Sequence, residues 1–547
     1  MKKRIAVAVV FVLVFVFALS ACGKSPATDD SAQATGDPGA ASGDTGEGAG
    51  VGALAPLVIG VAGSLSSLDV NQEAGILNYY IAAIAQEGLV GVNNEGELIP
   101  TLATAWEDED ATVWTFTIRE GVTFSDGTPL TADDVVYSIE NAMDPEKSPG
   151  VAIYFPDYVQ SVEQSGDREV VITLDGPHAS FITNVSNTGG LLVRPRAWGE
   201  SAAAPGSPQD LIVGTGPYTA AEFEPGSHVT FLANENWWGG KPELQQIRFD
   251  FFADENTRLL AFTQGDIDFA LNVPVDQSEQ WSKVDGAQVD FLNDRNYYGL
   301  TFDPGVAPFD DEHVRKAVAY AIDKEGIVNG SILKGHGTPA TAIPSPEQFA
   351  VALEVDVAAA QLAEVTHYDF DLEAAKAELA QSSVPDGFET TITYPDSYPT
   401  TGQASLVLAE ALSGLGITLN VQEIPLDQWL NEVGNGEQGV AWMIYGPTTL
   451  EPGEITMWLL DAQGPGYNPA NWTDEEVAAL TAEVFSAPNF EAQIAPTIES
   501  NSIAQEQAIY APVWWGQAAI AYQSYTQVKD YNSMSLLGSN WPQLFVA

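Results

Sequence analysis

The sequence predicts an α/β protein built from several lobes, and three observations point to this fold class. The chain has 547 residues, enough for about three or four globular units. Hydrophobic residues make up 45% of the chain and aromatic residues 10%, which is sufficient for a large packed core. Candidate strands and amphipathic helices follow one another along the whole chain. Such mixing is typical of α/β architecture.

Residues 1–21 have the pattern of a signal peptide. Three basic residues at positions 2–4 precede an apolar run at 5–19, and small residues follow. As a helix this run is about 22 Å long, short of a bilayer core of about 30 Å. A basic start, a short apolar stretch and small residues predict a secretory signal that is removed. An uncleaved anchor helix is the alternative.

The only cysteine of the chain, Cys22, follows this signal. The segment Leu19–Gly23 reads LSACG and resembles the lipobox of bacterial lipoproteins, in which the cysteine is lipidated and becomes the new N-terminus. Two acyl chains would provide stable anchoring. Residues 22–55 are then predicted to be a lipidated cysteine and a disordered tether, because they contain few bulky apolar side chains.

The first elements of the body are a strand and a helix. Residues 113–118, VWTFTI, alternate with period two, which predicts a half-buried strand. Asp126-Gly127 is a turn signal, and Thr131 with Asp134 matches a capping box. The helix that begins there carries three apolar residues on one face. They are Val135, Ile139 and Met143.

Later segments repeat this mixture. Residues 247–252 and 267–273 are predicted buried strands, and residues 256–264 between them a helix. Residues 311–322 form a predicted helix with acidic residues in its first turn.

A βαβ unit is expected further along the chain. Residues 388–394 and 416–421 are candidate strands on either side of a candidate helix at 403–412. Parallel pairing through a crossover helix is the natural connection for such a unit.

Charge and residue counts exclude several functions. The chain has 20 Lys and Arg against 75 Asp and Glu, a net charge of −55. Nucleic-acid partners and docking on anionic lipid through a basic patch are therefore not expected. One cysteine excludes disulfides within the chain, and five scattered histidines form no HExxH motif. We predict no catalytic residues, no cofactor and no metal site.

Several blocks then resemble solute-binding protein family 5, the extracellular receptors of peptide and nickel ABC importers. The first blocks are Pro100–Trp106, Trp114–Arg119 and Gly121–Val135, and similar blocks follow downstream. The downstream blocks are Gly214–Tyr218, Asn236–Pro242, Gln264–Asp268, Phe309–Asp323, Tyr368–Asp369 and Ala374–Lys376.

The resemblance implies a two-lobed periplasmic-binding-protein type II fold with an extra domain inserted in the first lobe. The implied first lobe comprises residues 56–97, 211–298 and 513–547, the inserted domain 98–210 and the second lobe 299–512. The chain is expected to cross between lobes near 291–301 and 508–515.

The resemblance also implies a set of ligand-binding residues in the cleft. In related peptide receptors the ligand pairs through its backbone, and roomy pockets accept its side chains. The candidates on the first strand segment, the hinge strands and the second lobe's rim are Ser67, Leu68, Asn272, Tyr298, Trp442, Tyr445 and Trp514. Core packing is the alternative for each aromatic, and capping for Asn272.

One departure concerns the ligand's ammonium group. Peptide receptors of this family commonly carry an aspartate soon after the rim tryptophan, but here Tyr445–Glu454 reads YGPTTLEPGE. Glu451 or Glu454 is the candidate replacement, with solvated loop positions as the alternative.

We therefore expect a lipid-anchored, monomeric receptor on the outer face of the bacterial cell membrane. It would close on an oligopeptide and pass it to an ABC permease. An oligosaccharide is the second candidate ligand and a nickel complex the third. A secreted lipoprotein hydrolase is the alternative of another class.

Overall fold

The structure is a computed structural model that describes residues 56–547 except 74, 156–157, 436–437, 461–467, 533, 537–543 and 547. The predicted signal peptide, Cys22 and the predicted tether lie outside these residues. Among the described helices none combines the length and the apolar character needed to cross a bilayer.

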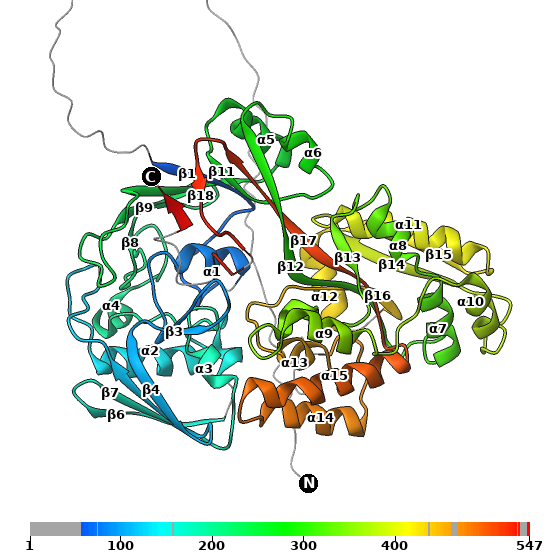
Figure 1. Cartoon of the computed structure of the whole chain (residues 1–547), viewed down its shortest axis with the longest axis horizontal. Helices are drawn as coiled ribbons and strands as arrows, with labels where there is room; N and C mark the ends of the chain where they lie inside the picture. Colours follow the sequence, from blue (N-terminus) through cyan, green and yellow to red (C-terminus); the bar gives the residue numbers. More distant parts are fainter. Residues whose placement is uncertain are drawn as a thin grey trace, which may run out of the picture. The chain divides into compact units, whose positions relative to one another are not determined.

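The largest sheet of the described residues has nine strands and extends through both lobes (Figure 1). Its order is β16-β12-β17-β11-β1-β10-β9-β8, with β13 paired to β17. β1 is parallel to β10 and β11, while β12 is antiparallel to both of its neighbours. The strands are β1 (Leu57–Ala62), β8 (Tyr218–Glu224), β9 (His228–Ala233), β10 (Gln246–Phe252), β11 (Phe269–Val273), β12 (Ala287–Phe302), β13 (Gly337–Pro339), β16 (Val440–Tyr445) and β17 (Tyr510–Gln523).

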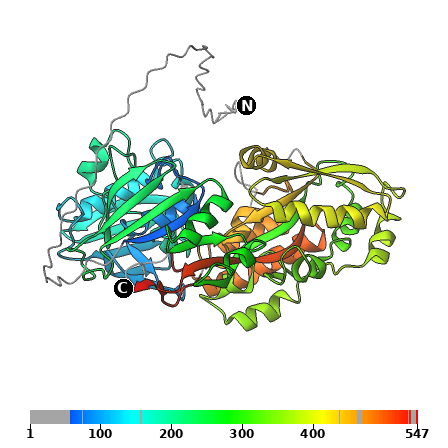
Figure 2. The same ribbon diagram turned by 90° about the horizontal axis from the view of Figure 1, so that it is seen from above.

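Two long strands, β12 and β17, pass from one lobe to the other. They contain 16 and 14 residues and pair antiparallel from Ala287↔Gln523 to Thr301↔Tyr510. We call lobe I the part whose core comes from residues 57–281 and 519–545, and lobe II the part whose core comes from 297–515. Figure 2 shows the two strands running between the lobes.

Lobe I also holds a four-stranded antiparallel sheet of order β4-β5-β7-β6. The predicted strand 113–118 is confirmed as β5, and the predicted helix as α2. The Thr131 side chain accepts a hydrogen bond from the Asp134 backbone N–H, as the capping box predicts. Val135 and Ile139 are buried against this sheet.

The remaining elements of lobe I are short. The bounds are α1 (Ile76–Ala82), β2 (Val90–Val92), β3 (Leu98–Pro100), β4 (Ala103–Glu109), β5 (Val113–Ile118), α2 (Ala132–Met143), η1 (Ala152–Tyr154), β6 (Val159–Gly166), β7 (Glu169–Leu174), α3 (Phe181–Asn184), α4 (Arg196–Ser201), α5 (Glu255–Gln264), α6 (Ser278–Trp281), β18 (Gln527–Val528) and β19 (Phe545–Val546).

In lobe II the predicted βαβ unit is confirmed. β14 and β15 are parallel, and α11 connects them. The helix starts at Pro399, earlier than predicted, because proline at the first helical position is compatible with a helix start. The bounds in lobe II are α7 (Glu312–Tyr320), α8 (Lys324–Asn329), η2 (Pro346–Phe349), α9 (Val355–Leu362), α10 (Leu372–Leu379), β14 (Glu389–Pro395), α11 (Pro399–Ser413), β15 (Thr418–Ile424), α12 (Leu426–Asn435), α13 (Glu454–Leu460), α14 (Glu475–Phe485) and α15 (Phe490–Glu506).

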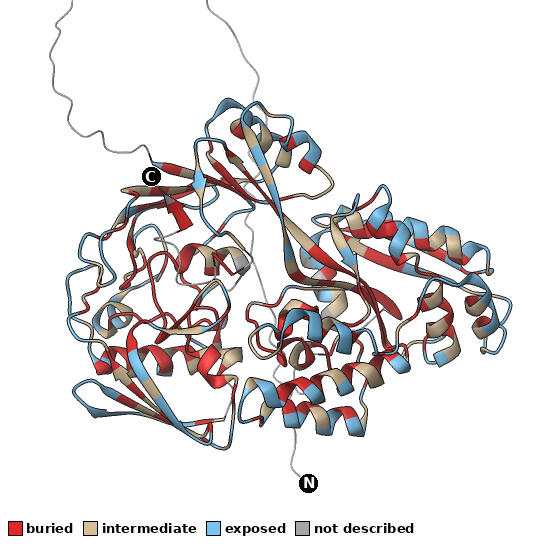
Figure 3. Ribbon diagram, in the orientation of Figure 1, coloured by how far each residue is buried: buried red, intermediate tan, exposed pale blue. Residues whose placement is uncertain are grey.

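Two predicted elements have different ends. The predicted strand 267–273 begins at Phe269, since Gly265 ends α5 in a left-handed conformation and the chain needs a short turn before pairing resumes. The predicted helix 311–322 spans Glu312–Tyr320, and Asp311 is its N-cap. Figure 3 shows buried residues along β12 and β17 as well as in both lobes.

Candidate ligand site between the lobes

Three of the predicted site residues form one aromatic group at the hinge end of lobe II. The Tyr298 ring stacks on the Trp514 ring, with centroids 4.7 Å apart and planes at 13°. The Trp442 ring is tilted by 58° against the Trp514 ring, with centroids 5.5 Å apart, and its indole N–H donates to the Ser405 hydroxyl at 2.8 Å. Trp442 and Trp514 are buried, whereas Tyr298 is half-buried. Tyr298 is therefore the member of the group with a face left for other contacts.

In lobe I, Leu68 is buried and the neighbouring Ser67 is half-buried. Leu68 is 0% exposed, and its backbone N–H donates to the Gly206 carbonyl at 2.9 Å. The Ser67 hydroxyl donates to the Pro205 carbonyl at 3.1 Å and accepts from the Asp69 backbone N–H at 3.1 Å. Neither residue lines the two cavities described below.

Asn272 is exposed at a bulge of β11, where the pairing with β17 shifts register. Its backbone has a φ of +47°, a left-handed conformation that asparagine tolerates better than most residues. The side chain forms a hydrogen bond with the phenol of Tyr80 from α1. Asn272 therefore lies in the same neighbourhood as a tyrosine of lobe I.

Glu454 shapes the loop that follows β16. Its side chain accepts hydrogen bonds from the backbone N–H groups of Thr448 and Thr449 at 2.8 and 2.9 Å. It also accepts from both threonine hydroxyls and, at 3.0 Å, from the Tyr445 hydroxyl. The residue is 4% exposed, so the solvated-loop alternative does not describe it.

Glu451 bridges the two lobes. Its carboxylate accepts a hydrogen bond from the Ser180 hydroxyl of lobe I and one from the Gln493 amide of α15 at 2.8 Å. A second bond between the lobes runs from the Ala179 backbone N–H to the Ala487 carbonyl at 3.0 Å. Burial raises the pKa of Glu451 to about 7, against the lowering effect of these two hydrogen bonds.

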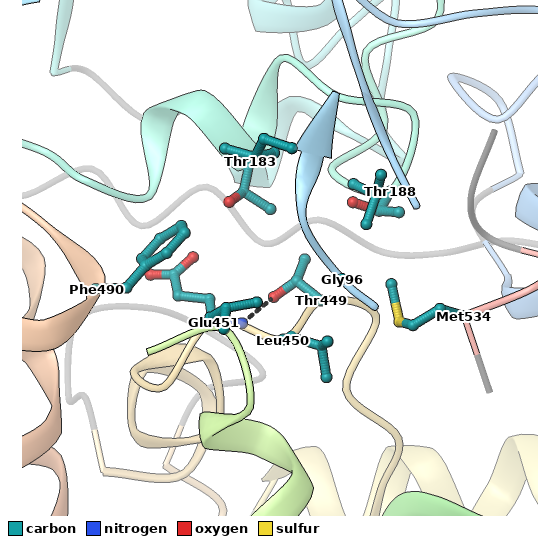
Figure 4. A pocket seen from close by; sticks show the side chains of 11 residues that line it. Gly96, Thr183, Thr188, Thr449, Leu450, Glu451, Phe490 and Met534 are labelled. Atoms are coloured by element: carbon teal, nitrogen blue, oxygen red, sulfur yellow. Dashed lines mark hydrogen bonds between the residues drawn. The ribbon is translucent and has the colours of Figure 1, made fainter. Parts of the chain in front are cut away.

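A cavity of about 270 Å³ lies next to this bridge and takes its lining from both lobes (Figure 4). Figure 4 shows Thr183 and Thr188 facing Thr449, Leu450 and Glu451 across it. Gly96 has a φ of +81°, which favours glycine, and a Cβ there would require the Leu450 side chain to move. The lining is Val92, Gly96, Leu98, Thr183, Thr188, Val351, Thr449, Leu450, Glu451, Phe490 and Met534.

A second cavity, of about 280 Å³, lies at the hinge. It is bounded by β12, β13, β17 and η2, and two of its lining residues are carboxylates. The lining is Asn293, Asp294, Thr338, Pro346, Glu347, Trp515 and Gly516.

Sequence reasoning missed the residues that hold the loop after β16. The buried Arg295 guanidinium donates to the carbonyls of Thr449 and, at 3.2 Å, Pro447. The Gln348 amide donates to the carbonyls of Thr449 and Glu451 at 3.1 and 2.7 Å. Arg295 lies within the expected lobe crossing near 291–301, whereas nothing local in the sequence distinguishes Gln348.

The described residues contain no group of three or more His, Cys, Asp and Glu side chains placed to hold a metal ion. The linings of the two cavities contain aromatic rings, threonine hydroxyls and carboxylates.

The family of the chain follows from comparison with known proteins. The model of the bacterial extracellular solute-binding proteins, family 5, middle region, matches residues 97–467, which is more than half of the chain. The chain belongs to this family. The match includes all the blocks on which the resemblance rested, from Pro100–Trp106 to Ala374–Lys376.

The names of the relatives of this family 5 protein indicate different ligands. It is 28% identical over 408 residues to the probable D,D-dipeptide-binding periplasmic protein DdpA of Escherichia coli, covering 72% of this chain and 75% of that protein. It is 26% identical over 442 residues to heme-binding protein A of Haemophilus influenzae, covering 76% and 79%.

A solved structure shows the same fold. The periplasmic binding protein DppA from Helicobacter pylori in complex with the peptide STSA matches with a TM-score of 0.76 at 21% identity, covering 90% of this chain and 98% of that one. The predicted two-lobed periplasmic-binding-protein fold is therefore confirmed.

Proposed function

We propose that this family 5 protein is the receptor of an ABC importer that closes its two lobes on an oligopeptide and delivers it to a membrane permease. The observation that carries the proposal is the pair of lobes joined by β12 and β17 and meeting again at Glu451, where a cavity takes its walls from both. A connection of only two strands allows the lobes to rotate relative to each other, and hinge closure around a ligand is the usual motion of such receptors.

The relatives favour a peptide as the ligand. The names of DdpA and of the DppA complex with STSA both include a peptide. Every peptide presents the same main-chain hydrogen-bonding groups, so a receptor that binds through them accepts peptides of many sequences.

Mass spectrometry of the solutes that co-purify with the native full chain tests the proposal. We expect peptides of varied sequence in the material released by denaturation, and none in a mock purification. Release of oligosaccharides without peptides would contradict the peptide ligand and favour the second candidate. Turnover of a released solute by the purified protein would favour a hydrolase.

We further infer that Cys22 is the lipidated N-terminus of the mature protein and holds it on the outer face of the membrane. The support is the lipobox-like LSACG around the only cysteine of the chain. The Cys22→Ser variant is expected to appear in the medium or to keep its signal, as followed by fractionation and mass measurement. A variant that is cleaved and still sediments with membranes would contradict lipid anchoring.

A further inference from the structure

Asp294 lies on β12, at a point where the pairing of this strand with β17 is interrupted. The pairing of β12 with β17 shifts register between Asn293 and Tyr297, so Asp294 lies where the ladder is broken. A Cβ at the facing Gly516 would come within 2.9 Å of the Asp294 Oδ1 and 3.0 Å of the Tyr298 ring. The absence of a side chain at Gly516 therefore leaves room for this carboxylate at the edge of the hinge cavity.

Three tyrosines lie close enough to Asp294 for its charge to influence their pKa values. Tyr80 belongs to α1 of lobe I, Tyr298 to β12, and Tyr398 precedes α11 of lobe II. After burial, the charge of Asp294 is among the causes that raise the pKa values of all three. The rings of Tyr298 and Tyr398 lie 6.3 Å apart at 62°. The charge of Asp294 therefore acts on tyrosines that belong to both lobes.

Asp294 has no cationic partner among the described residues. Its two carboxylate oxygens accept hydrogen bonds from the backbone N–H and the side-chain amide of Asn296, at 2.8 and 2.7 Å. The neighbouring Arg295 directs its guanidinium to carbonyls of the loop after β16 instead. Burial raises the pKa of Asp294 to about 6, more than the Asn296 hydrogen bonds and Arg295 lower it.

The two acids predicted from the sequence, Glu451 and Glu454, already have hydrogen-bond partners in the protein. Glu454 accepts hydrogen bonds from three side-chain hydroxyls and two backbone N–H groups, and Glu451 holds Ser180 and Gln493. The cavity beside Glu451 is lined largely by apolar side chains. The hinge cavity instead combines Asp294 and Glu347 with the indole of Trp515.

We propose that Asp294 binds a protonated amine of the transported solute in the hinge cavity, with Glu347 adding negative charge and Trp515 an aromatic face. A carboxylate removed from water gains more from an ammonium group than an exposed one does. An aromatic ring attracts the same cation. This inference rests on the proposed receptor function.

A simple amine tests the site without knowledge of the natural ligand. The full chain, freed of bound solute by dialysis, is titrated with n-butylammonium chloride at pH 7.5 and followed by ligand-observed NMR. n-Butanol is the neutral control. We expect Asp294→Asn to weaken butylammonium binding about 10- to 100-fold, the loss typical of a charge-assisted hydrogen bond, and to leave butanol unaffected.

Asp290→Asn is the matched control, because Asp290 is an exposed aspartate on the same strand. It is expected to bind butylammonium as the wild type does. Glu347→Gln provides a second variant in case Asp294→Asn does not fold, and it too should weaken binding. No binding to the wild type, or equal binding by Asp294→Asn and Asp290→Asn, overturns the proposal.

A peptide arm separates this inference from the proposed function. A tripeptide library and its N-acetylated twin are passed over the wild type, Asp294→Asn, Glu451→Gln and Glu454→Gln. We expect the wild type to retain free peptides better than acetylated ones and Asp294→Asn to lose that preference. If the wild type retains no peptide, the peptide function fails while the butylammonium titration still decides the role of Asp294. An unchanged preference in Asp294→Asn with its loss in Glu451→Gln or Glu454→Gln would overturn the proposal.

Discussion

Replacing Arg194 with methionine is expected to lower the free energy of unfolding by about 3–5 kcal/mol. The guanidinium of Arg194 forms two hydrogen bonds with the Asp69 carboxylate, at 2.7 and 2.8 Å. The side chains are 3% and 1% exposed. Removal of the arginine leaves the carboxylate buried without a counter-charge, and this costs more than the pair itself contributes. Denaturant unfolding followed by circular dichroism measures the loss.

Arg196→Met is the matched control, since Arg196 pairs with Asp133 at 2.7 Å but both side chains are much more exposed. Water screens such a pair, and we expect a loss of at most about 1 kcal/mol. The double variant Asp69→Asn/Arg194→Met should be more stable than the sum of the single losses predicts, because no unpaired charge remains. Equal losses for Arg194→Met and Arg196→Met would contradict the assigned role of the buried pair.

The second large effect is a rise in stability as the pH falls from 7 toward 5. Burial raises the pKa of Glu87 and of Glu451 to about 7, from an ordinary value of 4.5. Between these values the folded protein holds protons that the unfolded chain has released. Stability therefore falls as the pH rises through this window. The effect amounts to about 3 kcal/mol for each group.

Glu87 allows the cause to be isolated. It accepts hydrogen bonds from the Thr215 hydroxyl at 2.7 Å and from the indole N–H groups of Trp237 and Trp238 at 3.2 and 2.9 Å. Glu87→Gln is expected to flatten the slope of unfolding free energy against pH by one proton. Glu107→Gln, at an exposed position of β4, is expected to leave the slope unchanged. The same slope in Glu87→Gln as in the wild type would show that this carboxyl is not the source.

Local patterns were sufficient for much of the fold. The period-two alternation of 113–118 predicted β5, and the capping box at Thr131 predicted the start of α2. The βαβ unit of lobe II was predicted because its two strands and helix are contiguous in the chain. These predictions succeeded because each depends on residues close together in sequence, whose periodicity reflects one buried face.

The candidate site was predicted less completely. The sequence identified Tyr298, Trp442 and Trp514, and the structure brings them into one aromatic group. It also identified Leu68, whose neighbours in the folded chain come from the core of lobe I and bury it. In the sequence, an apolar residue of the core cannot be told from an apolar residue that contacts a ligand. Only the packing around it in the folded chain distinguishes the two.

Several strands and helices, and the family, were predicted from the amino-acid sequence because each depends on contiguous residues. The export signal at residues 1–21 stays a prediction, since it lies outside the described residues. The partner of each buried charged group could not be predicted from the sequence, because that partner lies far away in the chain. Ser180 and Glu451 are 271 positions apart, and Asp69 and Arg194 are 125 apart. Folding alone brings such groups together and removes their water, and these contacts determine which carboxylates are held by the protein and which remain for a ligand.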